Sequence, residues 1–155
     1  MIEVFDKNWV ISIETKAKNR ITLDTVTFEV KIDDLNVVHP WEYEKSWILL
    51  EVKEYNNILF YSFTIEWNHL VIITNDKFDL KEEILSFFGD VDILVIIWSK
   101  DSAKIFENIE ARLVIPFWEA KDIFLNTLWQ HIEEVDSYKV KSDFSLDSTE
   151  FVNLK

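Results

Sequence analysis

The stretch LFYSFTIEWNHLVIITND, residues 59–76, contains two apolar runs separated by a polar turn. The first run follows the Tyr55-Asn56-Asn57 turn, so residues 58–65 are expected to be the return strand of a hairpin that begins near Ile48. The second run, residues 70–73, is continuous and rich in β-branched side chains, which is typical of a strand buried on both faces. The stretch therefore predicts neighbouring strands of one sheet.

Upstream of this stretch, apolar and polar residues alternate with a period of two. Residues 26–32 show the pattern most clearly, and shorter alternations surround Ile11 and Ile21. A period of two predicts strands that have one face in the core and one face in water.

Downstream, the apolar spacing changes to that of helices. Asp79 followed by Glu82 resembles a capping box, and Gly89, the only glycine in the chain, stands where this helix would end. A buried strand is expected over 92–97, and a short helix capped by Asp101 follows it. A second strand is expected over 112–115, where Pro116 stops it, and a helix is expected from Glu119 through Leu128. The tail, which contains Tyr138, Phe144 and Phe151, is expected to form short strands. Strands first and a βαβαβ half later predict one α/β domain over residues 1–155, a sandwich of sheets with helices on an outer face.

The composition excludes several classes of protein. The chain has 155 residues, 48% of them hydrophobic, which is enough for the core of one ordinary domain. Cysteine is absent, so disulfides, thiolate metal sites and a cysteine nucleophile are excluded. The acidic net charge of -13 repels nucleic acids and anionic membrane surfaces. We therefore expect no nucleic-acid partner and no membrane partner. The N-terminal segment lacks a basic start and an apolar core, and the longest apolar run, Ile93 to Trp98, is far shorter than a membrane span, so we expect a soluble cytoplasmic protein.

Five short motifs occur in the order found in one known family. They are HPWEYEKSW (39–47), the stretch quoted above, GDVDILVIIWSK (89–100), ARLVIPFWEA (111–120) and VDSYKVKSDFSLDSTEFVNLK (135–155). Together they resemble the metallo-β-lactamase-fold hydrolases of the ascorbate-lactonase-like "Zn-dependent hydrolase" type, over roughly residues 36–155. The resemblance implies a shortened αββα sandwich. It also implies that the matching signature positions are structural, namely Pro40, Trp41, Glu42, Tyr43, Glu44, Asp92 and Pro116.

The resemblance further implies a metal pair held by a His-x-His-x-Asp-His loop, a later bridging Asp and a late His. Asp76 matches the bridging Asp, as a vestigial ligand, whereas Trp118 stands at the late His position. No histidine forms the loop, and the segment between Asp24 and His39 is too short to contain it with its helix.

The other candidate ligands have ordinary structural explanations. His39 precedes a proline and is expected at the end of a strand, and His69 is expected in a solvated turn. His131 and Glu134 have the helical i, i+3 spacing of a weak metal site, but an exposed polar segment explains them as well. Asp79 is expected to cap a helix rather than to bind a metal.

Two functions follow from the missing ligands. The first is a non-catalytic binding or assembly domain, a pseudoenzyme without cofactor that forms a homo-oligomer or binds an unknown protein. The alternative is a zinc-dependent hydrolase that uses Asp76 with a rearranged or partner-completed set of ligands. A shared fold does not by itself decide between them.

Tryptophan is abundant where glycine is expected. The chain has seven Trp and one Gly, and Trp41, Trp47, Trp67, Trp98 and Trp129 stand on or near glycine positions of the family or at a helix end. One hypothesis is that the source genome reads the codon UGA as glycine, so that translation under another code gives tryptophan. The other is that these residues are literal core or surface aromatics. The glycine deficit favours the first, and the codons would decide.

Overall fold

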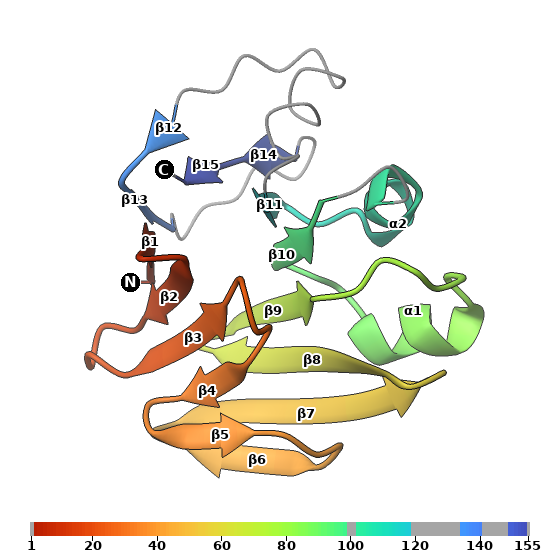
Figure 1. The fold of residues 1–155 in the computed structure, drawn as a ribbon, viewed down its shortest axis with the longest axis horizontal. Helices are drawn as coiled ribbons and strands as arrows, with labels where there is room; N and C mark the ends of the chain where they lie inside the picture. Colours follow the sequence, from red (N-terminus) through yellow and green to blue (C-terminus); the bar gives the residue numbers. More distant parts are fainter. Residues whose placement is uncertain (1, 99–101, 119–133, 141–148, 155) are drawn as a thin grey trace.

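The computed structural model describes residues 2–98, 102–118, 134–140 and 149–154. Two large sheets dominate this part of the chain, and Figure 1 shows both of its helices beside the second sheet. The first sheet consists of β1 (Glu3–Lys7), β2 (Val10–Glu14), β3 (Arg20–Asp24), β4 (Val30–Ile32), β5 (Leu35–Val37) and β13 (Ser137–Lys139). The second consists of β6 (Glu42–Lys45), β7 (Ile48–Tyr55), β8 (Ile58–Ile65), β9 (Asn68–Ile73), β10 (Ile93–Ile97), β11 (Leu113–Phe117) and β14 (Glu150–Phe151). The helices are α1 (Glu82–Phe88) and α2 (Ser102–Ile109), and β12 (Glu134–Val135) with β15 (Asn153–Leu154) forms a small third sheet.

The two large sheets differ in how their strands pair. The first has the order β13-β1-β2-β3-β4-β5, and all its pairs are antiparallel. The second has the order β14-β11-β10-β9-β8-β7-β6, in which β6 to β9 are antiparallel whereas β9, β10, β11 and β14 are parallel. Parallel neighbours need a crossover, and α1 and α2 lie in the two crossovers after β9 and β10.

Alternate residues of the second sheet enter two different cores. Tyr61 and Phe63 of β8 belong to the cluster that fills the space between the two sheets. Phe60, on the opposite face of β8, packs in a second cluster with Ile84 of α1 and Ile105 of α2. The central strands are therefore buried on both faces, as the continuous apolar run of residues 70–73 predicts.

The predicted fold class is wrong. The sequence was expected to give an α/β protein, an αββα sandwich, but strands hold 52% of the described residues and helices only 11%. The two described helices span seven and eight residues, and both pack on the second sheet. Residues 30–32 and 35–37 form the short strands β4 and β5 of the first sheet. The helix expected from Glu119 through Leu128, and Phe144 in the tail, lie outside the described residues.

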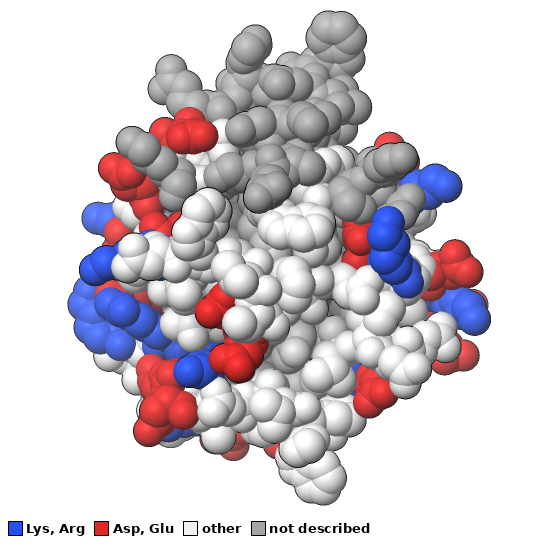
Figure 2. All heavy atoms as spheres, in the orientation of Figure 1, with Lys and Arg blue, Asp and Glu red and all other residues white. Residues whose placement is uncertain are grey.

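The described surface shows no separate basic face in the view of Figure 2, where lysine and arginine side chains lie beside acidic ones. In the described part of the chain, no helix is long and apolar enough to cross a membrane.

Candidate functional site

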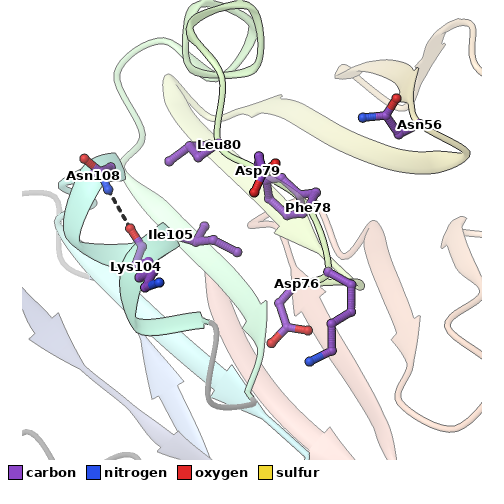
Figure 3. A pocket seen from close by; sticks show the side chains of 9 residues that line it. Asn56, Asp76, Phe78, Asp79, Leu80, Lys104, Ile105 and Asn108 are labelled. Carbon is purple, nitrogen blue, oxygen red and sulfur yellow. Dashed lines mark hydrogen bonds between the residues drawn. The ribbon is translucent and has the colours of Figure 1, made fainter.

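A cleft lies beside the ends of the central parallel strands, at the place where α2 faces the chain between β9 and α1. Its volume is about 680 Å³. Figure 3 shows that its side chains come from the β7–β8 turn, from the segment after β9 and from α2. The lining residues are Asn56, Asp76, Lys77, Phe78, Asp79, Leu80, Lys104, Ile105 and Asn108. Ligands of sheets with parallel strands bind at the carboxyl ends of those strands, so this cleft is the first candidate site.

Asp76 is the buried acidic group of the cleft, with only 5% of its surface exposed. The Ser102 hydroxyl oxygen lies 2.8 Å from Asp76 Oδ2 and 2.8 Å from the carbonyl oxygen of Ile97, and either oxygen can accept its single proton. Ser102 is itself fully buried and is the first residue of α2. The pair therefore joins the end of β9 to the start of the helix, and it gives Asp76 a structural role.

Charged and apolar groups alternate around the rest of the cleft. Asp79 and Lys104 are exposed, whereas Phe78 is half-buried and Ile105 is buried, and all four line the cleft. Asn108 donates from its side-chain amide to the Lys104 carbonyl oxygen at 2.6 Å, which orders this turn of α2. The cleft can therefore contact a small molecule that has both polar and apolar parts.

Asp79 does not cap α1, contrary to the sequence prediction. The residue preceding the helix is Lys81, and no side-chain capping hydrogen bond is made there. Asp79 lies two residues earlier, where its carboxylate lines the cleft. Its role is therefore in the cleft wall, and Glu82 begins the helix without a capping partner at Asp79.

The described histidines lie away from Asp76 in the hydrogen-bond network. His69 Nδ1 is 2.7 Å from the Asp90 carbonyl oxygen, and His69 Nε2 is hydrogen-bonded to the Ser62 hydroxyl. Both ring nitrogens of His69 are thus engaged on β9, which is a strand rather than the expected turn. The main-chain oxygen of His39 accepts a hydrogen bond from the Tyr43 hydroxyl at 2.8 Å. His131 lies outside the described residues, so its predicted pairing with Glu134 stays a prediction.

The described residues do not fit the metal pair that the family resemblance implies. Such a site needs several imidazole and carboxylate ligands converging on one point. Within residues 2–98, 102–118, 134–140 and 149–154, no three His, Cys, Asp or Glu side chains are grouped to hold a metal ion. Asp76 instead accepts a hydrogen bond from a serine that lies where no family ligand was expected.

The signature positions have structural environments. Glu42, Tyr43 and Glu44 lie in β6 at the edge of the second sheet, and Pro40 and Trp41 precede that strand beside a shallow second cleft of about 330 Å³. Asp92 precedes β10 and accepts the main-chain N–H of His69 at 2.8 Å, with Arg112 Nε at 3.8 Å from its other oxygen. Pro116 lies within β11 opposite Ile96. Trp118 follows β11 and is half exposed, with a φ of 98°.

Sequence reasoning missed Ser102, Lys104 and Asn108. Asp101 was expected to cap the helix, and it lies outside the described residues. The available signal was the serine at the start of a helix, where serine often makes hydrogen bonds that fix the helix end. Nothing in the local sequence indicated that its partner would be Asp76.

Comparison with known proteins bears on the fold. No family model matches the chain, and no curated protein sequence matches it. A solved structure from Thermotoga maritima, described as a "putative Zn-dependent hydrolase of the metallo-β-lactamase superfamily", aligns with a TM-score of 0.76 over 99% of each chain, at 12% sequence identity. Identity this low shows the fold alone. The resemblance read from the motifs is confirmed at that level: the chain has the fold of the metallo-β-lactamase superfamily.

Proposed function

We propose that this metallo-β-lactamase-fold chain is a non-catalytic binding or assembly protein, and that the cleft beside Asp76 is its ligand site. The observation that carries the proposal is the hydrogen bond between Asp76 and Ser102, both buried. A bridging carboxylate directs its oxygens to metal ions, whereas this carboxylate orders the start of α2. The position matched to the bridging ligand has become part of the scaffold.

Trp118 supports the same proposal. It occupies the position that the family resemblance assigns to the late histidine ligand. Its φ is 98°, a value that residues other than glycine rarely adopt. The indole N–H of tryptophan is only a hydrogen-bond donor, so Trp118 supplies no metal ligand at the end of β11. Two of the matched ligand positions, Asp76 and Trp118, are in this way used or shaped for something other than metal binding.

The first experiment measures zinc binding by the purified protein. The expected result is less than one zinc per chain after dialysis at neutral pH, and a thermal unfolding midpoint that neither zinc nor a chelator shifts. The Asp76→Asn variant keeps an acceptor for Ser102, and Asp79→Asn is its matched control from the same segment, because Asp79 is exposed. Stoichiometric zinc that is lost in Asp76→Asn and kept in Asp79→Asn would overturn the proposal.

The alternative function is a zinc-dependent hydrolase with a rearranged or partner-completed site. One observation favours it: Asp76 lies in a cleft beyond the carboxyl end of β9, the kind of place where sheets with parallel strands bind ligands. Zinc-dependent turnover of simple ester or lactone substrates, abolished in Asp76→Asn and unchanged in Glu83→Gln, an exposed residue of α1 outside the cleft lining, would establish it. Absence of turnover with zinc present supports the binding function.

Partners follow from charge and from the assembly hypothesis. A net charge of -13 makes nucleic acids and anionic membranes unfavourable partners. We therefore propose that the protein binds a small molecule, a second copy of the chain or another protein. Sedimentation velocity over a range of protein concentrations tests the homo-oligomer. A single monomer boundary at all concentrations would remove self-assembly from the proposal and leave ligand binding.

A further inference from the structure

Four hairpins of the structure turn through two successive residues with positive φ. They connect β1 to β2, β6 to β7, β7 to β8, and β8 to β9. The φ values are 54° and 66° at Asn8 and Trp9, 56° and 66° at Ser46 and Trp47, 51° and 65° at Asn56 and Asn57, and 46° and 69° at Glu66 and Trp67. Two positive φ angles in a two-residue hairpin loop define the type I′ turn, whose second position is dominated by glycine.

Tryptophan holds this second position in three of the four turns. The fourth holds Asn57, and asparagine is the side-chain residue that tolerates positive φ best. An indole-bearing residue has no such tolerance, and its backbone is strained there. The four turns therefore separate into one with a suitable residue and three with a bulky residue that rarely adopts this conformation.

The three indole side chains are exposed, so burial does not offset the strain of their backbone. Trp9 is 70% exposed, Trp47 is 90% exposed and Trp67 is 100% exposed. Burial is what usually makes a tryptophan favourable, since the ring can remove a large apolar area from water. These side chains combine an unfavourable backbone with an exposed apolar ring.

Trp118 shows the same conflict outside a hairpin. Its φ of 98° lies beyond the usual left-handed region, and half of its surface is exposed. Positive φ is thus found at four of the six tryptophans that the structure describes. The remaining two give no backbone argument, because neither Trp41 nor Trp98 has positive φ.

We infer that positions 9, 47, 67 and 118 are glycine in the protein as its source makes it, because a codon translated here as tryptophan is read there as glycine. It leaves the function proposed above in place, because neither tryptophan nor glycine at position 118 supplies a metal ligand. It adds Trp9 and Trp118 to the positions suspected from the sequence, and it rests on backbone geometry rather than on family glycines. It also accounts for a single glycine in a chain of 155 residues that is built from tight turns.

Glycine at these four positions would give the protein a different surface. Glycine at the turns removes three exposed rings, and the β1–β2 turn becomes an Asn-Gly pair, the most favoured type I′ dipeptide. Association of the recombinant chain through these rings would then be a property of the tryptophan-containing product. The position after β11 would carry no side chain at all.

The direct test reads the four codons and the masses of the matching peptides from the source cells. UGA codons with peptides of glycine mass at positions 9, 47, 67 and 118 are the expected result. UGG codons at these positions, or peptides of tryptophan mass, would overturn the inference. The codon of Trp98 carries no weight in either direction, because its backbone makes no demand for glycine.

A second test measures the strain itself in three purified proteins. One has the printed sequence, one combines Trp→Gly at positions 9, 47, 67 and 118, and the matched control has Trp→Ala at the same positions. Alanine removes the indole but keeps Cβ, so the comparison of glycine with alanine isolates the backbone. We expect the glycine protein to exceed the alanine protein in Tm by roughly 2–4 °C per position.

The comparison remains decisive if the printed sequence aggregates, because it needs only the glycine and alanine proteins. Equal Tm values for these two would overturn the claim that the positions require glycine. Trp98→Gly provides the opposite control, since Trp98 is buried and the change removes core packing. Its Tm is expected to fall.

Discussion

Asp76 and Ser102 are 26 residues apart in sequence and share a hydrogen bond of 2.8 Å between two buried side chains. The bond fixes the first residue of α2 against the end of β9. Ser102→Ala is expected to lower the free energy of unfolding by about 1–3 kcal/mol, because a buried carboxylate loses a donor. Urea unfolding followed by circular dichroism measures the change.

Ser86→Ala is the matched control for this prediction. Ser86 lies on the exposed side of α1, and alanine is at least as favourable as serine in a helix. Its midpoint is expected to stay within error of the parent protein. A Ser102→Ala midpoint equal to that of Ser86→Ala would show that the bond does not stabilise the fold.

Gly89 gives a prediction about backbone conformation alone. It ends α1 with φ 59° and ψ -146°, and a Cβ added there would meet no atom within 4 Å. Gly89→Ala is therefore expected to cost about 1–3 kcal/mol through the backbone, since this region is nearly exclusive to glycine. Chemical unfolding of the variant checks the loss, and an unchanged stability would mean that the helix end relaxes freely.

The hairpin of β7 and β8 could be predicted from the sequence because its signals are local. The alternation after Ile48, the Asn56-Asn57 turn and the return strand at 58–65 are all present. The local pattern is misleading over residues 26–32, where alternation predicts one strand but only Val30–Ile32 forms one. The Asp24 carboxylate accepts the N–H groups of Val26 and Thr27, and Phe28 has positive φ, so a turn replaces the first half of the expected strand.

Features set by tertiary pairing could not be predicted. Pro116 was expected to stop its strand, but β11 continues to Phe117. Leu113 donates its N–H to Asp92 on the β10 side, so the nitrogen of residue 116 points to the other side, where β14 pairs only with Leu113 and Val114. A missing N–H costs little at that point. Likewise, Asp76 was selected from the sequence, whereas its partner Ser102 depends on the crossover.

Glu14 is predicted to contribute acid-dependent stability. The hydrogen bond from Lys18, at 2.9 Å, and then that from Arg20, at 2.8 Å, hold the pKa of Glu14 below its usual value of 4.5. A lowered folded-state pKa gives stability that is present above pH 4.5 and lost as pH falls through the folded-state value. Glu14→Gln should therefore be less stable than the parent protein at pH 7, and this difference should shrink below pH 4.5.

The control for Glu14 is Glu107→Gln, which changes an exposed residue of α2. Thermal unfolding of both variants across the acidic range separates the local effect from the change in net charge. Parallel pH profiles for the parent protein and Glu14→Gln would contradict the prediction.

Tyr61 is predicted to contribute to alkaline unfolding. Burial between the two sheets, with a smaller effect from Tyr43, raises the pKa of Tyr61 from 10.0 to about 12. As pH rises from 10 towards 12, the unfolded chain releases a proton that the folded chain keeps, so the folded state loses stability. Tyr61→Phe has no proton to release, and its stability should decline less over this range than that of the parent protein.

Tyr55→Phe, at the less buried end of β7, serves as the control, and unfolding curves recorded at several alkaline pH values give the measurement. If Tyr61→Phe lost stability with pH as steeply as the parent protein and Tyr55→Phe, the buried hydroxyl would not be the group that titrates with unfolding.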